Sequence, residues 1–220
     1  MRSHIIRLIL LAELLLLGSL FFAPSNRVSA ENPQTLATHE ISLSNRWSNQ
    51  WVNDVFKDNI LLTLKYLNNE INRGQAINWQ QVNQPATYSF PLNPGETFAF
   101  HDDILPEYRG KIVKTTNSHF SFSEGFRSDG YLFGDGVCHL ASLLYWTARD
   151  AKLFAVAPTS HNFALIQEIP KEYGVSIYNS FSDKGVNARQ NLYITNSSNR
   201  TIVFMITYNG KTLTSRVIQE

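Results

Sequence analysis

The chain has 220 residues, and its 19 Lys and Arg against 18 Asp and Glu give a formal net charge of +1. The basic residues are scattered, so neither a nucleic-acid footprint nor an acidic tail is present, and no nucleic-acid partner is expected. Neither standard type of glycine-rich phosphate loop occurs, which argues against nucleotide use. No cofactor is expected, and no metal, because the histidines include no short spaced pair that supplies half of a zinc site.

The first thirty residues have the anatomy of an export signal. Two arginines precede an apolar run at residues 8–23, and Val28-Ser29-Ala30 supplies the small residues that a signal peptidase reads. Glu13 lies inside this run, which is shorter than the ~20 residues that span a bilayer comfortably. We therefore expect residues 1–30 to be a signal peptide or, alternatively, an N-terminal anchor. The protein is then exported to the extracellular space, the periplasm or the cell envelope, and meets a membrane only through this segment.

The rest of the chain fits one domain. Residues 31–46 are polar and include Pro33, which predicts a flexible segment. Residues 47–220 are expected to form a single domain that is long enough to bury most of its apolar surface without crosslinks.

The first half of this domain is expected to be a long helix followed by a hairpin. Apolar residues recur at helical spacing across residues 48–71 without a proline, and Asn72-Arg73-Gly74 would end the helix in a left-handed cap. Tyr88-Ser89-Phe90 and the alternating run at residues 97–100 flank Pro94-Gly95, which predicts two strands joined by a turn.

A second helix is expected from Val137, and it carries the only cysteine of the chain, Cys138, in its first turn. Gly134-Asp135-Gly136 would supply a capping carboxylate and conformational freedom at the helix start. The unpaired amides and partial positive charge at a helix N-terminus favour a thiolate and lower a cysteine pKa by ~1 unit or more. A lone cysteine cannot close an intrachain bridge, so Cys138 is either a reactive thiol or a small buried hydrophobe.

A histidine and an asparagine follow this helix in the order that thiol enzymes use. His161 would begin a strand at residues 161–166, with a hairpin partner at residues 175–178 and Asn179 just beyond it. Papain-like and transglutaminase-like enzymes use such an order for acyl transfer. Cys138 would be the nucleophile and His161 the general base, and Asn179, or alternatively Asp183, would orient the imidazole. Alternatively, His161 is a hydrogen-bonding partner in a packed strand.

The C-terminal part predicts three strands, at residues 191–195, 201–208 and 212–218. Asn209-Gly210 between two alternating runs is the strongest short-range hairpin signal. The fold class is therefore α+β, with a long N-terminal helix, then a mixed or antiparallel sheet and a central cysteine-bearing helix, of papain or transglutaminase type.

Several blocks of the chain resemble the VanW family, cell-envelope proteins named for a vancomycin-resistance cluster. The resemblance covers roughly residues 59–208, and its Pro-Gly-Glu-Thr-Phe and Gly-Val-Cys blocks are specific when taken together. The blocks are Asn59-Ile60 to Leu67-Asn68, Leu92 to Phe100, Gly134 to Cys138 with Ser142, Leu144-Tyr145 and Ala148, Ser160-His161, and Asn191 to Asn196.

The chain also departs from the pattern of this family. Asp135 stands where the family has a glycine and His139 where it has a glutamine, and we expect both, with Tyr145, to be binding residues. Thr159 replaces the first of two closely spaced histidines. Gly174 replaces an aspartate, which removes one candidate for orienting the imidazole.

Two functions from different classes follow. The first is a thiol-dependent acyl-transfer or hydrolytic enzyme of the cell envelope, acting on peptidoglycan peptides. The second is a non-catalytic envelope module that binds wall peptides or an envelope protein, with an open groove lined by aromatic residues such as Phe120, Phe122, Tyr131 and Trp146. Core packing is the alternative for Phe120 and Phe122, because they alternate.

Overall fold

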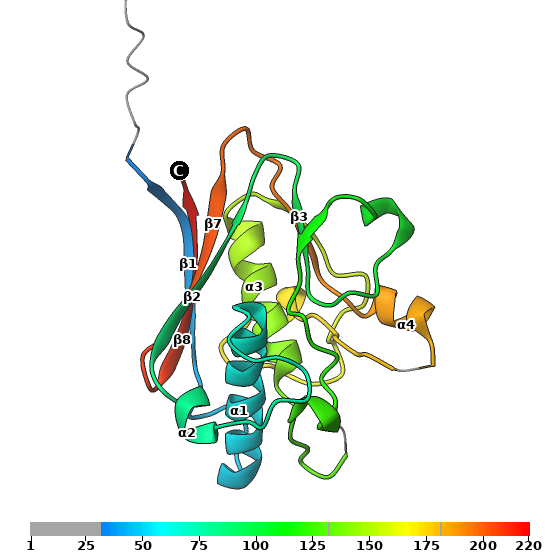
Figure 1. Ribbon diagram of the computed structural model, residues 1–220. Helices are drawn as coiled ribbons and strands as arrows, with labels where there is room; N and C mark the ends of the chain where they lie inside the picture. Colours follow the sequence, from blue (N-terminus) through cyan, green and yellow to red (C-terminus); the bar gives the residue numbers. More distant parts are fainter. Residues whose placement is uncertain (1–31, 132, 181) are drawn as a thin grey trace, which may run out of the picture. The chain divides into compact units, whose positions relative to one another are not determined.

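The computed structural model describes residues 32–131, 133–180 and 182–220 (Figure 1). Within these residues the protein is a mixed α+β structure with two four-stranded sheets and four α-helices. The expected signal peptide or anchor at residues 1–30 lies outside the described part of the chain. None of the described helices is both long and apolar enough to cross a membrane.

The first sheet is antiparallel throughout and has the strand order β1-β8-β7-β2. Its strands are β1 (Gln34–Ser42), β2 (Ala86–Leu92), β7 (Ile202–Tyr208) and β8 (Thr212–Gln219). The expected C-terminal hairpin is confirmed as β7 and β8, and Asn209 closes its turn by donating its backbone N–H to the carbonyl of Thr212 at 3.2 Å.

The second sheet is smaller and mixed, with the order β4-β3-β6-β5. Strands β3 and β4 are parallel, and the other pairs are antiparallel. Its strands are β3 (Thr97–Ala99), β4 (Ile112–Lys114), β5 (Phe154–Val156) and β6 (Tyr193–Thr195).

The described residues also form helices, of which α3 covers one face of the first sheet. They are α1 (Gln50–Leu67), α2 (Trp79–Val82), α3 (Val137–Asp150) and α4 (Lys184–Arg189), with short 3₁₀ turns η1 (Pro106–Tyr108), η2 (Phe122–Glu124) and η3 (Lys171–Tyr173). Helix α3 packs against β1 and β8, against α1 and against β5. Figure 1 shows α1 and α3 side by side, between the first sheet and β3.

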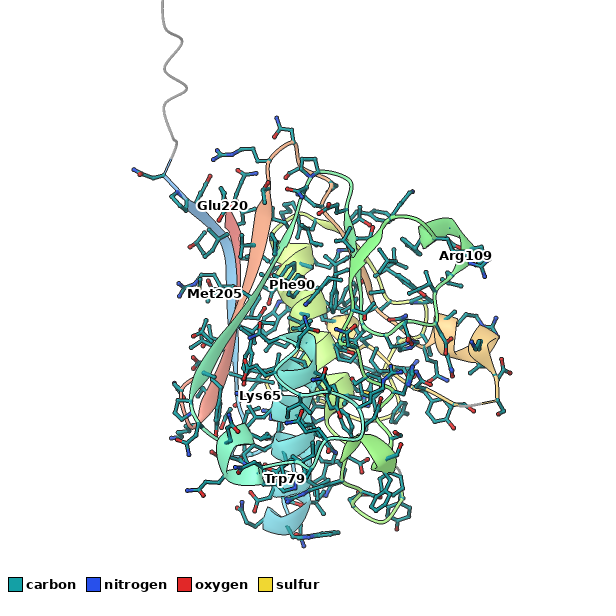
Figure 2. The ribbon with its side chains drawn as sticks, in the orientation of Figure 1. Lys65, Trp79, Phe90, Arg109, Met205 and Glu220 are labelled. Atoms are coloured by element: carbon teal, nitrogen blue, oxygen red, sulfur yellow. The ribbon has the colours of Figure 1, made fainter. Side chains whose placement is uncertain are left out.

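One hydrophobic core joins the two sheets. The ring of Phe90 on β2 stacks on Phe98 of β3 at 4.9 Å and on Phe204 of β7 at 5.1 Å. Phe90 points from the first sheet toward the helices, and Met205, one residue beyond Phe204, lies on the opposite face (Figure 2). Along β7 this alternation buries Ile202, Phe204, Ile206 and Tyr208 in the core and leaves the residues between them partly exposed.

The long helix at the start of the domain is confirmed as α1, but it ends earlier than expected. The side chain of Asn49 caps it by accepting the backbone N–H groups of Trp51 and Val52. The helix stops at Leu67, because Asn69 takes a left-handed conformation with a φ of 57°, which asparagine tolerates better than most residues. The predicted cap at Asn72-Arg73-Gly74 is therefore wrong.

The expectation that residues 31–46 are a flexible segment disagrees with the structure. Gln34–Ser42 forms strand β1, which pairs with β8 along its whole length. It is an edge strand of a sheet that has one face toward solvent, and Thr38 and Glu40 lie on that face while Ile41 is buried on the other. The polar composition reflects this exposed face, and the strand is held by backbone hydrogen bonds that composition does not reveal.

The predicted hairpin around Pro94-Gly95 is also wrong, because its two strands belong to different sheets. Strand β2 pairs with β7, whereas β3 pairs with β4 and β6. The turn itself exists, but Gly95 donates its N–H to the carbonyl of Asn196, and Asn196 donates to Glu96, both at 2.9 Å. These bonds tie the turn to the end of β6 and make it a corner between the sheets.

Helix α3 starts at Val137 as predicted, but no carboxylate caps it. Its N-cap is Gly136, in a left-handed conformation with a φ of 97° and no side-chain hydrogen bond. The carboxylate of Asp135 instead accepts the backbone N–H of Asp129 at 3.1 Å. A Cβ atom at position 136 would lie 2.6 Å from the carbonyl oxygen of Phe56 in α1, so this position requires glycine.

We predict that Gly136→Ala lowers the free energy of unfolding by roughly 2–5 kcal/mol, because it adds left-handed strain and a clash with rigid helix backbone. Urea denaturation measures the change. Gly74→Ala is the matched control, since Gly74 also has a positive φ but has nothing within 4 Å of the added Cβ, and about 1–2 kcal/mol is expected there. Equal losses in the two variants would contradict the close approach of α3 to α1.

Candidate functional site

A cavity of about 690 Å³ opens at the N-terminus of α3. Its size falls within the ~300–1,000 Å³ typical of small-molecule sites. The first turn of α3 forms one side, and the remaining walls come from α1 and from loops. The lining includes Cys138, His139 and His161 together with Asp135 and Asn179, so the fold gathers five of the six residues selected from the sequence.

The thiol of Cys138 is held against a backbone segment that follows η3. Ile177 donates its N–H to Sγ at 3.4 Å, and its carbonyl oxygen lies 3.6 Å from the same sulfur. Burial, together with the negative charge of Asp135, raises the pKa of the Cys138 thiol to about 11. The predicted lowering by the helix N-terminus is therefore wrong, because desolvation of the thiolate exceeds the effect of the helix start.

His161 lies on a loop and not on a strand. One bridge joins Ser160 to Val175, with His161 donating its N–H to the carbonyl of Gly174 at 3.0 Å. A Cβ atom at position 174 would lie 2.7 Å from the carbonyl oxygen of His161, so glycine permits this approach. Beyond His161 the pairing stops, and the predicted strand at residues 161–166 does not form.

A backbone carbonyl fixes the tautomer of His161. Its Nδ1 atom lies 3.2 Å from the carbonyl oxygen of Ala164, which accepts only, so Nδ1 must carry the proton. In the neutral ring Nε2 is then an acceptor. Burial lowers the pKa of His161 below its ordinary value, which favours this neutral form at pH 7.

No hydrogen bond joins the Cys138 thiol to the His161 ring among the described contacts. The ring of His139 lies beside them, 6.4 Å from the His161 ring and 5.0 Å from the ring of Phe56. His139 is buried, and its Nδ1 atom has no hydrogen-bonding partner. Burial, with the nearby Arg46 and His161, lowers the pKa of His139 to about 3, so this imidazole is neutral.

Asn179 lies in the cavity but does not orient the imidazole. Its Oδ1 atom accepts a hydrogen bond from Asn187 at 3.3 Å, and its Nδ2 atom is buried without a partner. The orienting group for His161 is therefore the carbonyl of Ala164. Asp183, the alternative candidate for orienting His161, instead caps α4 by accepting the backbone N–H of Val186.

The remaining two expected binding residues differ in position. Asp135 lines the cavity, and burial raises the pKa of its carboxyl group to about 6, with a further contribution from the charge of Asp129. Tyr145 is not part of the lining. It faces Tyr173 at a ring distance of 6.1 Å and accepts a hydrogen bond from Arg149 at 3.2 Å.

Aromatic side chains that the sequence reasoning did not select form much of the cavity wall. Phe120 is buried, as core packing predicts, and it also lines the cavity. Phe122, which core packing does not describe, is 73% exposed and lines the cavity, as does the exposed Tyr131. Trp146, expected in a groove, instead stacks on His39 at 3.6 Å. The aromatic lining residues missed from sequence come from separate segments: Trp47, Phe56, Phe133, Phe163 and Tyr178.

The fold and the site together define an α+β protein with a thiol and an imidazole in an aromatic-lined cavity. Comparisons of the chain with protein families, with curated proteins and with solved structures found no match. The VanW resemblance therefore stays a prediction that rests on the residues quoted above. In the described part of the chain, no cluster of three or more His, Cys, Asp or Glu side chains is arranged to hold a metal ion.

We predict that alkylation of Cys138 by iodoacetamide rises with pH toward a midpoint of about 11, far above the ~8.5 of a free thiol. In Asp135→Asn the midpoint falls, because the negative charge that opposes the thiolate is removed. Asp54→Asn, which alters a carboxylate on α1 outside the cavity lining, should leave the alkylation midpoint unchanged. A wild-type midpoint near or below that of a free thiol would show that the helix start, and not burial, controls this sulfur.

Proposed function

We propose that this protein is an exported, VanW-like thiol enzyme of the cell envelope that catalyses acyl transfer or hydrolysis. Cys138 is the nucleophile and His161 the general base. One observation carries the proposal: the Ala164 carbonyl holds Nδ1 of His161, which leaves Nε2 as a proton acceptor in the cavity that Cys138 also lines. Titratable groups with displaced pKa values gather at functional sites, and four of them line this cavity.

The raised thiol pKa determines the kind of mechanism. The resting site holds a neutral thiol and a neutral imidazole rather than an ion pair. During attack, the Cys138 sulfur bonds to the substrate carbonyl carbon while its proton passes to Nε2 of His161. Collapse of the tetrahedral species breaks the bond to the leaving alcohol or amine, which takes the proton back from His161. Water or an amine then releases the acyl group from the thioester in the same way.

A papain- or transglutaminase-like architecture belongs to this proposal. A cysteine at the start of a central helix supports it, as does the order of cysteine and histidine along the chain. The histidine on a loop and the backbone carbonyl in place of an orienting side chain are features of this chain. The VanW resemblance implies peptidoglycan peptides as the source of the acyl group.

A non-catalytic binding module is the second candidate. It is favoured by the contacts of the Cys138 thiol with the backbone of Ile177 and by its raised pKa. In this case the aromatic cavity binds a wall component or an envelope protein, and the cysteine is a packing residue.

Hydrolysis of an activated ester separates the two candidates. We predict that the wild-type domain cleaves p-nitrophenyl butyrate and carries a transient butyryl group on Cys138, detected by intact mass, and that Cys138→Ala abolishes both. His161→Asn keeps a donor for the Ala164 carbonyl but lacks the Nε2 base, so its rate falls by ~10²–10⁴-fold.

His39→Gln is the matched control, because His39 pairs with Asp150 outside the cavity lining and glutamine retains a donor at the same reach. Its rate should equal that of the wild type. Cleavage that survives Cys138→Ala, or an absence of cleavage in a folded wild-type domain, would favour the binding module.

A further inference from the structure

The cavity is poorly suited to an anionic ligand. No lysine or arginine is among its described lining residues, and its carboxylates are those of Asp129 and Asp135. An anionic ligand would lose its hydration there without gaining a cationic partner, and it would face charge of its own sign. The free carboxylate that ends a peptide chain is therefore disfavoured in this site.

The mouth of the cavity is strongly apolar. Phe163 and Leu165 are 75% and 82% exposed, and they lie on the loop that follows His161. Phe122 and Tyr131, 73% and 91% exposed, line the same cavity from another segment. Large exposed apolar side chains that converge on one place mark a binding surface, whereas single scattered ones do not.

Two lining residues each carry a polar atom that is closed off from solvent and has no hydrogen-bonding partner among the described residues. They are Nδ1 of His139, a residue only 4% exposed, and the amide Nδ2 of Asn179. An unsatisfied buried polar group costs free energy, so each is expected to meet an ordered water molecule or, once its side chain rotates toward the cavity, a ligand atom. Asn179 Nδ2 is a donor, and a carbonyl oxygen is the acceptor that a substrate of Cys138 would bring.

The apolar character of the cavity wall limits the ligand. A bound peptide brings an N–H and a carbonyl at every residue, and each of them needs a partner once it is buried. Most of this wall is apolar, so it is better suited to a ligand with a single carbonyl than to a buried peptide.

We infer that the cavity takes an uncharged fatty acyl group, with its carbonyl at Cys138 facing Asn179 and its aliphatic chain along the aromatic walls toward Phe163 and Leu165. This inference rests on the proposed function for the thiol reaction, and it replaces the peptide acyl source that the VanW resemblance implies. The binding of the aliphatic chain does not require turnover. Asn179 is then a donor to the acyl oxygen, in the manner of an oxyanion hole. The residue that sequence reasoning assigned to orient the imidazole acts on the substrate instead.

A series of p-nitrophenyl esters tests whether the cavity binds an aliphatic chain. From butyrate to octanoate, kcat/KM should rise by about fourfold per methylene, or about 250-fold over the four methylenes. The suberate monoester, which has the octanoate length with a terminal carboxylate, should lose this gain. A kcat/KM that stays flat or falls with chain length overturns the inference. So does a suberate ester, or a phenylacetate ester with an aromatic ring in place of the aliphatic chain, whose kcat/KM equals that of octanoate. Cleavage of butyrate alone leaves the proposed enzyme intact.

A binding measurement separates failure of the inference from failure of the enzyme. The neutral dye N-phenyl-1-naphthylamine should bind the wild-type domain and be displaced by octanamide but not by the ω-carboxylated amide of equal length. Phe163→Asp should weaken displacement by octanamide at least tenfold. Phe154→Asp, which alters a similarly exposed phenylalanine on β5 outside the lining, should leave it unchanged.

Ester cleavage and dye displacement together distinguish the acyl-binding cavity from the enzyme. Displacement by octanamide without cleavage of any ester supports the acyl-binding cavity and rejects the enzyme. A dye that does not bind, or equal effects of the two phenylalanine variants, overturns the cavity as an acyl site.

Discussion

The backbone contact between the start of α3 and helix α1 is the constraint on which the site depends. Gly136 lies so close to Phe56 that no side chain fits there. The buried amide of Asn59 reinforces the contact, because it donates to the carbonyls of Arg127 and Asp135 at 3.0 and 2.9 Å and accepts the N–H of Arg127. The position of Cys138 is therefore set by the packing of two helices, and the loop before it is fastened to the same helix.

The parts of the fold that local patterns encode were the parts that could be predicted. Helical periodicity gave α1 and α3, and Asn209-Gly210 gave the β7–β8 hairpin. The errors lie where partners distant in sequence decide the structure. Strand β1 is held by β8 near the other end of the chain, and hydrogen bonds to Asn196 turn the Pro94-Gly95 hairpin into a corner between sheets. No property of those segments alone reveals such partners.

The same division applies to the candidate site. The thiol and the imidazole could be selected because cysteine and histidine are rare and chemically distinctive, and the fold does place both in one cavity. The group that orients the imidazole could not be predicted from the sequence, because it is the backbone carbonyl of Ala164, an atom that every residue possesses. The pKa of the Cys138 thiol could not be predicted either. Burial raises this pKa, and the degree of burial depends on cavity walls that come from segments distant in the sequence.

The loop that carries Phe163 and Leu165 also supplies the Ala164 carbonyl that holds the imidazole. A displacement of this loop relative to the imidazole would lengthen or break that hydrogen bond and would free the ring to rotate or exchange tautomers. A ligand that displaced the loop in this way would also change the proton affinity of His161. The apolar side chains at the cavity entrance and the carbonyl that orients His161 belong to the same short segment, so a substitution in this segment affects both.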